Sequence, residues 1–360
     1  MNEQLHSSID CQLDEWLSAQ PDNSFPKASD AGYVARYRNI VAFLSKEIHG
    51  EVDKQVMLDS LGDGIQAPEK IIYLTNHGFG HVEAVVKRAS DLVLNGGCQL
   101  SPYEVYLLLV AIQFHDVGNI LGRENHERKS ATLMNSMGMS AGLDQAEKRC
   151  ILRIAAAHCG NSAGGEGSIE KLEQEPYLLG QKVRPQLLAA ILRMADELAD
   201  DSTRASRYCM SEGLLPKGSE VFHAYSLCLH SVALDKTDIF LSYEFGEENA
   251  SRTFGKSAAG GIEQVYLLDE VFGRIVKMHM ERVYCSRFLR DNIRLDRIRC
   301  SISVSASYDV MEPVWKRSFS LQETGYPSIP RGGIASLCPE LSGVTGKELS
   351  SILEQVERRE

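Results

Sequence analysis

The sequence predicts a mainly α-helical protein with a smaller α/β domain toward its C-terminus. Between residues 71 and 201, apolar residues recur at the three- and four-residue spacing of amphipathic helices. Beyond residue 211, short apolar runs bounded by turn residues indicate strands beside one long helix. We therefore expect a helical lead-in (1–70), a helical core (71–210), a small α/β domain (211–320) and a linker with a C-terminal helix (321–360).

The composition is that of a soluble globular protein and narrows the classes of partner. The 360 residues are 43% hydrophobic and 24% charged, which is ample for a sizeable core. A formal net charge of −11 disfavours a broad nucleic-acid-binding face or an anionic membrane surface. Nine cysteines without a CxxC pair indicate reduced thiols in a cytoplasm rather than a disulfide framework. Neither a signal-peptide pattern nor a bilayer-length apolar run is evident, so we expect a cytoplasmic location and no membrane partner.

The lead-in offers one helical pattern, from Asp30 to Ile48, and no residues that indicate chemistry. The core begins with a helix expected to start near His81, where one apolar stripe follows. His77 lies four residues earlier and would share a helix side with His81 if the helix extended back that far. Two intervening glycines leave this open, so His77 is either a metal ligand or part of a polar helix entrance.

Residues 101 to 117 are expected to form a buried helix that ends in a His-Asp pair. Ser101 is a candidate N-cap, Pro102 suits the first helical position and Glu104 completes a capping box. The helix body is apolar nearly all round. His115 and Asp116 at its end would be costly to bury unless they are paired or bind a cation.

Two further helices deliver polar residues from apolar surroundings. A helix with Asp144 as cap and Glu147 three residues on is expected to carry His158 at its C-terminal end. A His at that place is also a common partner of the helix dipole. A helix from Pro185 carries Asp196 on the edge of its apolar stripe. One metal centre would explain His81, His115, Asp116, His158 and Asp196 together.

The only compact basic group near this candidate site consists of Arg123, Arg128 and Lys129. Such a run is usually a solvated helix face, but an anionic substrate would need cations of this kind. Both interpretations stay open for these residues.

The region after residue 211 predicts a small α/β domain. Residues 226–245 indicate two strands joined by a turn around Asp235 to Asp238, residues 264–290 a long amphipathic helix, and residues 296–306 another strand. Residues 321–342 are expected to be a linker, and Thr345 to cap a final helix. Substrate gating and dimerisation, which would make a homo-oligomer, are both open roles for this domain. His223, His230 and His279 have no ligand-like company and are interpreted as structural.

The ordered set His81, His115-Asp116, His126, His158 and Asp196 resembles the HD superfamily of metal-dependent phosphohydrolases. Residues ~70 to 205 carry the resemblance, which implies an all-helical HD-type core. It implies that His81, His115, Asp116 and Asp196 hold a first divalent ion, and that His126 and His158 are the extra ligands of dinuclear members, with Asp116 as the bridge. No GYP motif follows His158, a single His stands where dinuclear members often have two, and Asn119 replaces a frequent Lys or His. His77 could complete the ligand count.

The resemblance implies cleavage of a phosphoester by metal-activated water, in which Asp116, His126 and His158 act with the two ions. Ligation by imidazole and carboxylate suits Fe, Mn, Co or Ni better than Mg. Arg123, Arg128 or Lys129 would neutralise phosphoryl oxygens. We expect a nucleotide or another small phosphoester as the substrate. Two alternatives remain: an HD-type nuclease for single strands, which the net charge disfavours, and a catalytically degenerate module that binds a nucleotide.

Overall fold

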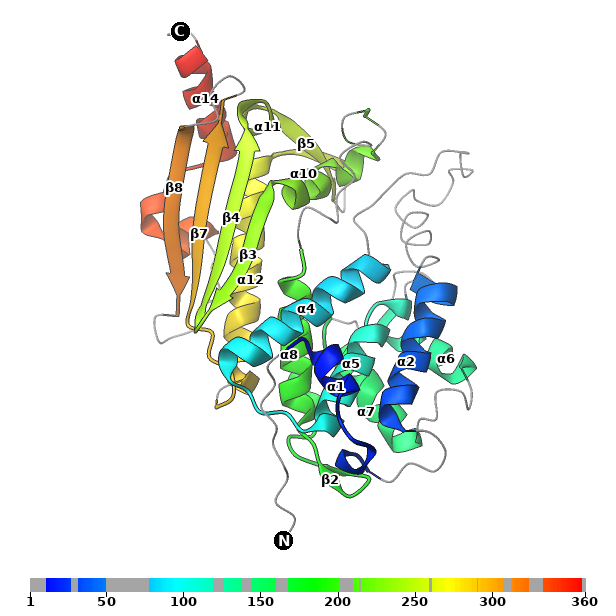
Figure 1. Ribbon diagram of the computed structural model, residues 1–360. Helices are drawn as coiled ribbons and strands as arrows, with labels where there is room; N and C mark the ends of the chain where they lie inside the picture. The colour runs from blue at the N-terminus through cyan, green and yellow to red at the C-terminus, as the bar shows by residue number, and fades with distance from the viewer. Residues whose placement is uncertain are drawn as a thin grey trace. The chain divides into compact units, whose positions relative to one another are not determined.

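The computed structural model describes most of the chain as two compact units (Figure 1). The described residues are 11–26, 32–49, 78–118, 126–137, 144–159, 168–200, 210, 212–213, 215–258, 261–289, 291–306, 312–323 and 333–357. The helical unit holds the described residues up to Ala199 together with Cys285–Arg294. The sheet unit holds those from Asp200 to Tyr284 and from Leu295 onward.

The helical unit is built almost wholly from α-helices that pack around α5. Its elements are α1 (Leu13–Ser18), η1 (Asp22–Ser24), α2 (Tyr33–Leu44), a π-helical turn η2 (Ser45–His49), α4 (Phe79–Gly96), α5 (Pro102–Phe114), α6 (His126–Ser136), α7 (Gln145–Ala156), η5 (Ile169–Lys171), the short hairpin β1 (Tyr177–Leu178) and β2 (Gln181–Lys182), and α8 (Pro185–Glu197). Helix α5 contacts α1, α2, α4, α7 and α8.

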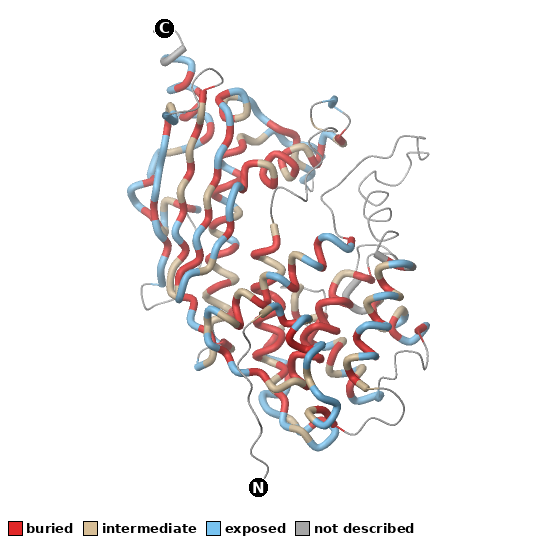
Figure 2. The backbone as a smooth tube through the Cα atoms, in the orientation of Figure 1, coloured by how far each residue is buried: buried red, intermediate tan, exposed pale blue. Residues whose placement is uncertain are grey.

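Helix α5 is the buried centre of this unit, as the sequence predicted. Every residue from Tyr103 to Phe114 is buried, and all of those from Val105 to Ile112 are 0% exposed. Figure 2 shows the buried residues running through the middle of the unit. A helix that is apolar on all sides is stable in water only when neighbours surround it, so α5 fixes the positions of the helices around it.

Two predicted capping boxes set where α5 and α7 begin. The Ser101 side chain accepts from the backbone N–H of Glu104, and the Glu104 carboxylate accepts from the backbone N–H of Ser101. Asp144 and Glu147 form the same arrangement at α7. The second oxygen of buried Glu147 accepts hydrogen bonds of 2.8 and 2.7 Å from the hydroxyls of Tyr33 and Tyr103. One cap therefore also joins α2, α5 and α7.

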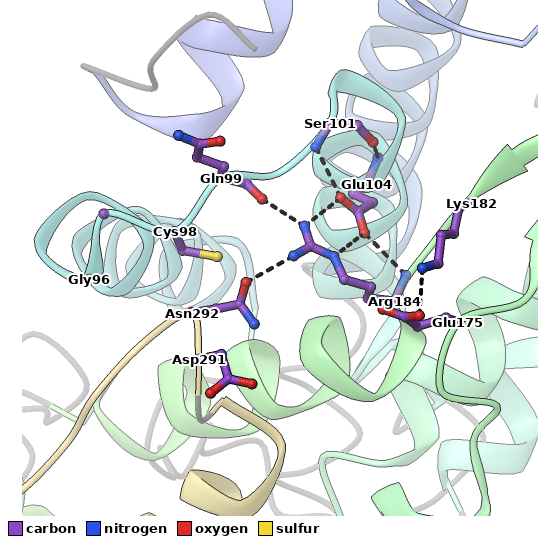
Figure 3. Close-up of a pocket in the computed structure, with 11 residues that line it drawn as sticks. Gly96, Cys98, Gln99, Ser101, Glu104, Glu175, Lys182, Arg184, Asp291 and Asn292 are labelled. Carbon is purple, nitrogen blue, oxygen red and sulfur yellow. Dashed lines mark hydrogen bonds and ion pairs between the residues drawn. The ribbon is translucent and has the colours of Figure 1, made fainter. Parts of the chain in front are cut away.

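The first turns of α5 and α8 are joined by a side-chain staple, which we define as Arg184 with Glu104. Arg184, the N-cap of α8, donates from Nε and Nη2 to the two carboxylate oxygens of Glu104, each at 2.8 Å. Its remaining bonds go to the carbonyl of Gln99 and to Oδ1 of Asn292 (Figure 3). These groups line a cavity of about 540 Å³. Most of the Arg184 donors are already bonded to neighbouring groups of the protein, so we interpret the lining of this cavity as structural.

The sheet unit contains a four-stranded sheet with a two-stranded hairpin and several helices. Its elements are η7 (Lys217–Ser219), α10 (Glu220–Cys228), β3 (Leu229–Asp235), β4 (Asp238–Gly246), α11 (Glu247–Ser251), β5 (Thr253–Ala258), β6 (Gly261–Tyr266), α12 (Leu267–Leu289), β7 (Arg297–Ser305), β8 (Pro313–Gln322), α13 (Ile334–Leu337), η8 (Pro339–Leu341) and α14 (Gly346–Glu357). The strand order is β3-β4-β7-β8, with β4 and β7 parallel and the other pairs antiparallel.

One face of the sheet is buried and the other is largely open to solvent. Buried and more exposed residues alternate along β4 and β7, which is the pattern of a sheet covered on one side. Helix α12 lies across the covered face in Figure 1, where Phe272 meets Phe319 of β8 with ring centroids 6.1 Å apart. The mainly helical fold with a C-terminal α/β part is therefore confirmed.

Several predicted boundaries change. Strands β3 and β4 turn at Lys236 and Thr237, as expected. The long helix starts at Leu267 rather than at Gln264, because residues 264–266 pair with β5 in a hairpin. The helix expected from Asp30 to Ile48 spans Tyr33–Leu44 and then widens into the π-helical turn η2. Thr345 does cap α14, since its hydroxyl accepts from the backbone N–H of Glu348.

The stretch 321–342, expected as a linker, contains the end of β8, α13 and η8 within its described residues. Among the helices that the structure describes, none combines the length and apolar character required to cross a bilayer.

Candidate metal centre

The His-Asp pair stands where α5 ends. His115 is the C-cap residue and is 0% exposed. Its Nδ1 lies 2.7 Å from the carbonyl oxygen of Ile112. Because a carbonyl oxygen can only accept, Nδ1 carries a proton, which leaves Nε2 as the ring atom that could bind a cation. The next residue, Asp116, has a side chain that is 12% exposed and follows in the turn after the helix.

Helices α4 and α8 bring a second His and a second Asp to the same place. His81 lies in the first turn of α4 and is buried. Its Nε2 is 3.3 Å from Nε2 of His115 and 3.1 Å from Oδ1 of Asp196. Oδ2 of Asp116 lies 3.4 Å from Nε2 of His115 and 3.8 Å from Nε2 of His81. We call His81, His115, Asp116 and Asp196 the HD cluster.

The HD cluster has the spacing and chemistry of a cation site. Donor atoms on one ion with bonds of ~2.1 Å lie roughly 3.0 to 3.4 Å apart in octahedral or tetrahedral geometry. The separations in the cluster run from 3.1 to 3.8 Å. Two imidazole nitrogens and two carboxylates would otherwise direct lone pairs at one another inside a largely buried site. His81, His115 and Asp116 alone already form a group that could hold a metal ion.

His158 faces the other oxygen of Asp116. It lies in the turn just after α7, which ends at Ala156, and not within the helix as expected. Its Nδ1 donates to the carbonyl oxygen of Ala155, and its Nε2 lies 3.6 Å from Oδ1 of Asp116. The two oxygens of one carboxylate are thus shared between His158 on one side and His81 with His115 on the other.

The carboxylates at the site favour positive charge on the groups around them. Burial alone would raise the pKa of Asp196, but its hydrogen bond with His81 and the nearby charges of His115, His81 and His158 hold that pKa well below its usual range. Burial alone would lower the pKa of His158, but its bond with Asp116 and contact with Cys159 raise it well above the ordinary value. Carboxylates that favour the protonated form of His158 will also attract a metal cation.

The structure describes only part of the remaining predicted site. His77, Arg123 and Asn119 lie outside the described residues, and His126 begins α6 without a described side chain, as does Arg128 within it. Lys129 is half-buried on α6. Its neighbour Ser130 donates a 2.9 Å hydrogen bond to the carbonyl of Phe114, which ties α6 to the end of α5 that carries the HD cluster.

Sequence reasoning did not single out Cys159. Its Sγ lies 3.2 Å from Nε2 of His158. The signal that could have found it is its place directly after a candidate ligand, since thiolate is as common a metal ligand as imidazole.

The arrangement defines a helical domain with a cluster of His and Asp side chains that could hold a metal ion. A family model described as HD-CE matches residues 71–276, more than half of the 360 residues, and the chain belongs to this HD-CE family. The HD resemblance predicted from the His and Asp positions is thereby confirmed. Comparisons with curated proteins and with solved structures gave no match. Family membership and the HD cluster together suggest a metal-dependent hydrolase of the HD type.

Proposed function

We propose that the protein is a metal-dependent phosphohydrolase that cleaves a nucleotide or another small phosphoester with two divalent ions. The observation that carries this proposal is the placement of Asp116 between two sets of histidines. Its Oδ2 faces His115 and His81, while its Oδ1 faces His158. A carboxylate so placed can hold two ions at the short spacing that two-metal hydrolases use.

The chain's own residues prepare the site before any ion or substrate arrives. Backbone carbonyls accept from Nδ1 of His115 and of His158, so Nε2 of each ring is the atom turned toward the carboxylates and could bind a cation. Burial of His81 and His115 excludes water from the inner side of the cluster. Asp196, with a side chain 28% exposed, marks the side open to solvent. When bound, the ions would polarise a phosphoryl oxygen and acidify water near it.

Two further roles belong to this proposal. His126 would complete the second cation position beside His158, and Lys129 with Arg123 would neutralise the oxygens of an anionic phosphoester. The imidazole and carboxylate donors favour Fe, Mn, Co or Ni over Mg. A net charge of −11 favours a small substrate over a nucleic-acid strand, whose binding needs many cationic contacts.

The test combines metal content with turnover, using full-length protein purified without chelator. Elemental analysis of the wild type, of Asp116→Asn and of the control Asp91→Asn would be followed by hydrolysis assays, which read phosphate from nucleoside phosphates, p-nitrophenol from the aryl diester, and the cleaved products of cyclic nucleotides and of the oligonucleotide by chromatography. The substrates are nucleoside mono-, di- and triphosphates, cyclic nucleotides, bis(p-nitrophenyl) phosphate and a single-stranded oligonucleotide. Asp91 is a matched control because it is a partly exposed acid on α4, paired with Arg88 and ten residues from His81.

We expect about two ions per wild-type chain, ion-dependent hydrolysis of a small phosphoester, and loss of both in Asp116→Asn but not in Asp91→Asn. Cleavage of the oligonucleotide alone would assign the nuclease activity instead. Metal-loaded wild type that hydrolyses nothing in the panel yet binds a nucleotide would establish the degenerate module and overturn the proposal.

A further inference from the structure

The sulfur of Cys159 lies beside His158, the histidine that faces Asp116 of the HD cluster. Helix α7 ends at Ala156, and the chain continues in a tight turn in which the backbone N–H groups of His158 and Cys159 bond to the carbonyls of Ala155 and Ala156. The His158 ring folds back so that Nδ1 meets the Ala155 carbonyl. This brings Nε2 to 3.2 Å from Sγ of the next residue, Cys159.

Two donor atoms of different kinds therefore lie beside Nε2 of His158. Sγ of Cys159 lies on one side at 3.2 Å, and Oδ1 of Asp116 lies on another at 3.6 Å. With metal bonds of about 2.1 Å to nitrogen and 2.3 Å to sulfur, neighbouring donors on one ion would lie roughly 3.1 to 3.6 Å apart. The Nε2–Sγ separation falls in this interval, and the Nε2–Oδ1 separation of 3.6 Å lies just beyond the ~3.0 to 3.4 Å of two ligands with bonds of ~2.1 Å. The His158 side chain is only 6% exposed, so bulk water does not serve these groups from all sides.

We infer that Cys159 is a metal ligand, and that Oδ1 of Asp116, Nε2 of His158 and Sγ of Cys159 form a cation site for a thiophilic divalent ion such as Zn²⁺, Co²⁺ or Fe²⁺. Binding would displace the thiol proton to solvent. A thiolate ligand selects these ions over Mg²⁺ and Mn²⁺, which prefer oxygen. The inference deepens the proposed function, on which it rests, by making the two cation positions chemically different: an all-N/O position at the HD cluster and an N/O/S position at Cys159.

The other described cysteines set a clean background for a test. Burial raises the pKa of the thiols at five positions, which keeps them protonated and unreactive; these are Cys98, Cys150, Cys228, Cys300 and Cys338. Cys11 is partly exposed, as Cys159 is, and lies in the helical unit before α1. It therefore provides the matched control thiol.

The experiment titrates Co²⁺ into chelator-treated full-length protein and follows its absorption. Wild type and Cys11→Ser should show thiolate-to-cobalt charge-transfer absorption in the near ultraviolet as well as the visible bands of cobalt. Cys159→Ser should lose the ultraviolet band and keep the visible bands from the HD cluster. In parallel, iodoacetamide labelling of Cys159, read by peptide mass spectrometry, should be blocked by Co²⁺ in the wild type and not in Asp116→Asn. Labelling of Cys11 should not change.

Visible cobalt bands without charge-transfer absorption in the wild type, or an ultraviolet band that persists in Cys159→Ser, would overturn the inference. Neither result touches the proposed hydrolysis, which is read by the products of substrate cleavage and could proceed with nitrogen and oxygen ligands only. If Co²⁺ produces no absorption at all, both the inference and the two-ion site are wrong. The labelling assay needs no variant of Cys159, so a folding defect in Cys159→Ser would still leave a decisive result.

Discussion

Replacement of Arg184 by Met should destabilise the helical unit more than the loss of the exposed ion pair that lines the same cavity. Met keeps much of the aliphatic volume but removes every donor of the guanidinium. Glu104, which is 3% exposed, would lose the two charge-assisted bonds that Arg184 gives to its carboxylate oxygens at 2.8 Å. It would keep the backbone N–H groups of Ser101 and of residue 184.

The expected loss follows from these bonds. A hydrogen bond to a charged group contributes about 1.5 to 3 kcal/mol. The Arg184 side chain is 26% exposed, so water can replace part of what is removed and the lower value applies to each bond. Two such bonds give a loss of about 3 kcal/mol, the lower end of what breaking a buried ion pair costs. The bonds to Gln99 and Asn292 add little, because water can satisfy those neutral acceptors.

The assay uses the placement of the two tryptophans of the chain, Trp16 and Trp315. Trp16 is buried in α1 of the helical unit, and Trp315 is in β8 of the sheet unit. In a Trp315→Phe background, urea unfolding followed by tryptophan fluorescence reports the helical unit alone. The free energy of unfolding would be measured with and without Arg184→Met.

Lys182→Met is the matched control. Lys182 lines the same cavity and pairs with Glu175, but the two side chains are 50% and 47% exposed, so its loss should be below ~1 kcal/mol. Glu104→Gln combined with Arg184→Met should be less harmful than the sum of the single changes, because no buried charge is left alone. A loss of unfolding free energy in Arg184→Met no larger than in Lys182→Met would contradict this prediction. Additive losses for Arg184→Met and Glu104→Gln would contradict it as well.

Three further predictions concern the sheet unit and the cation site. Burial would raise the pKa of Asp238, but hydrogen bonds from Arg299 and Arg297 lower it, so its contribution to stability is present above the unfolded value of ~3.9 and lost as pH falls through the folded value. Asp238→Asn should therefore reduce the unfolding free energy, read by Trp315 fluorescence, by about 1 kcal/mol at neutral pH, because water screens the two partly exposed arginines. The loss should become progressively smaller in acid. A loss of the same size at neutral and at acid pH would contradict this prediction. Gly346→Ala should cost about 1 to 3 kcal/mol in the same assay, since a Cβ there would lie 2.1 Å from Cβ of Tyr266, whereas Gly273→Ala, with open space around it in α12, should be neutral or stabilising. Adding Mn²⁺ or Co²⁺ to chelator-treated protein at 100 times the dissociation constant should raise the unfolding free energy reported by Trp16 by about 2.7 kcal/mol, and should fail to do so in Asp196→Asn.

The helical half of the fold could be predicted because its signals are local. The caps at Ser101 and Asp144 need only residues within three positions, and both boxes form. The polar residues of the candidate site could be predicted from their surroundings. A His or Asp among the apolar residues of a buried helix is costly without a partner, and one cation would be a partner for several of them at once.

Other features depend on contacts that local sequence does not carry. Residues 264–266 suit a helix as well as a strand, and only pairing with β5 decides that they belong to a hairpin. Strand β8 alternates weakly because Lys316 and Arg317 interrupt its apolar positions, and its register comes from β7. The closeness of Cys159 to His158 Nε2 depends on the orientation of the His158 ring, which the sequence does not show.

The two helices that leave the Arg184–Glu104 staple both contain 13 residues. They act as spacers of matched length, about 20 Å at 1.5 Å per residue, between the Arg184–Glu104 pair at one end and residues of the HD cluster at the other. Each residue of a helix sets both the position of a side chain along the axis and its direction around the axis. Deleting one residue within α5 would draw His115 and Asp116 back by ~1.5 Å and turn them by ~100° relative to Asp196. We therefore expect α5 and α8 to accept changes of side chain far more readily than any change of length.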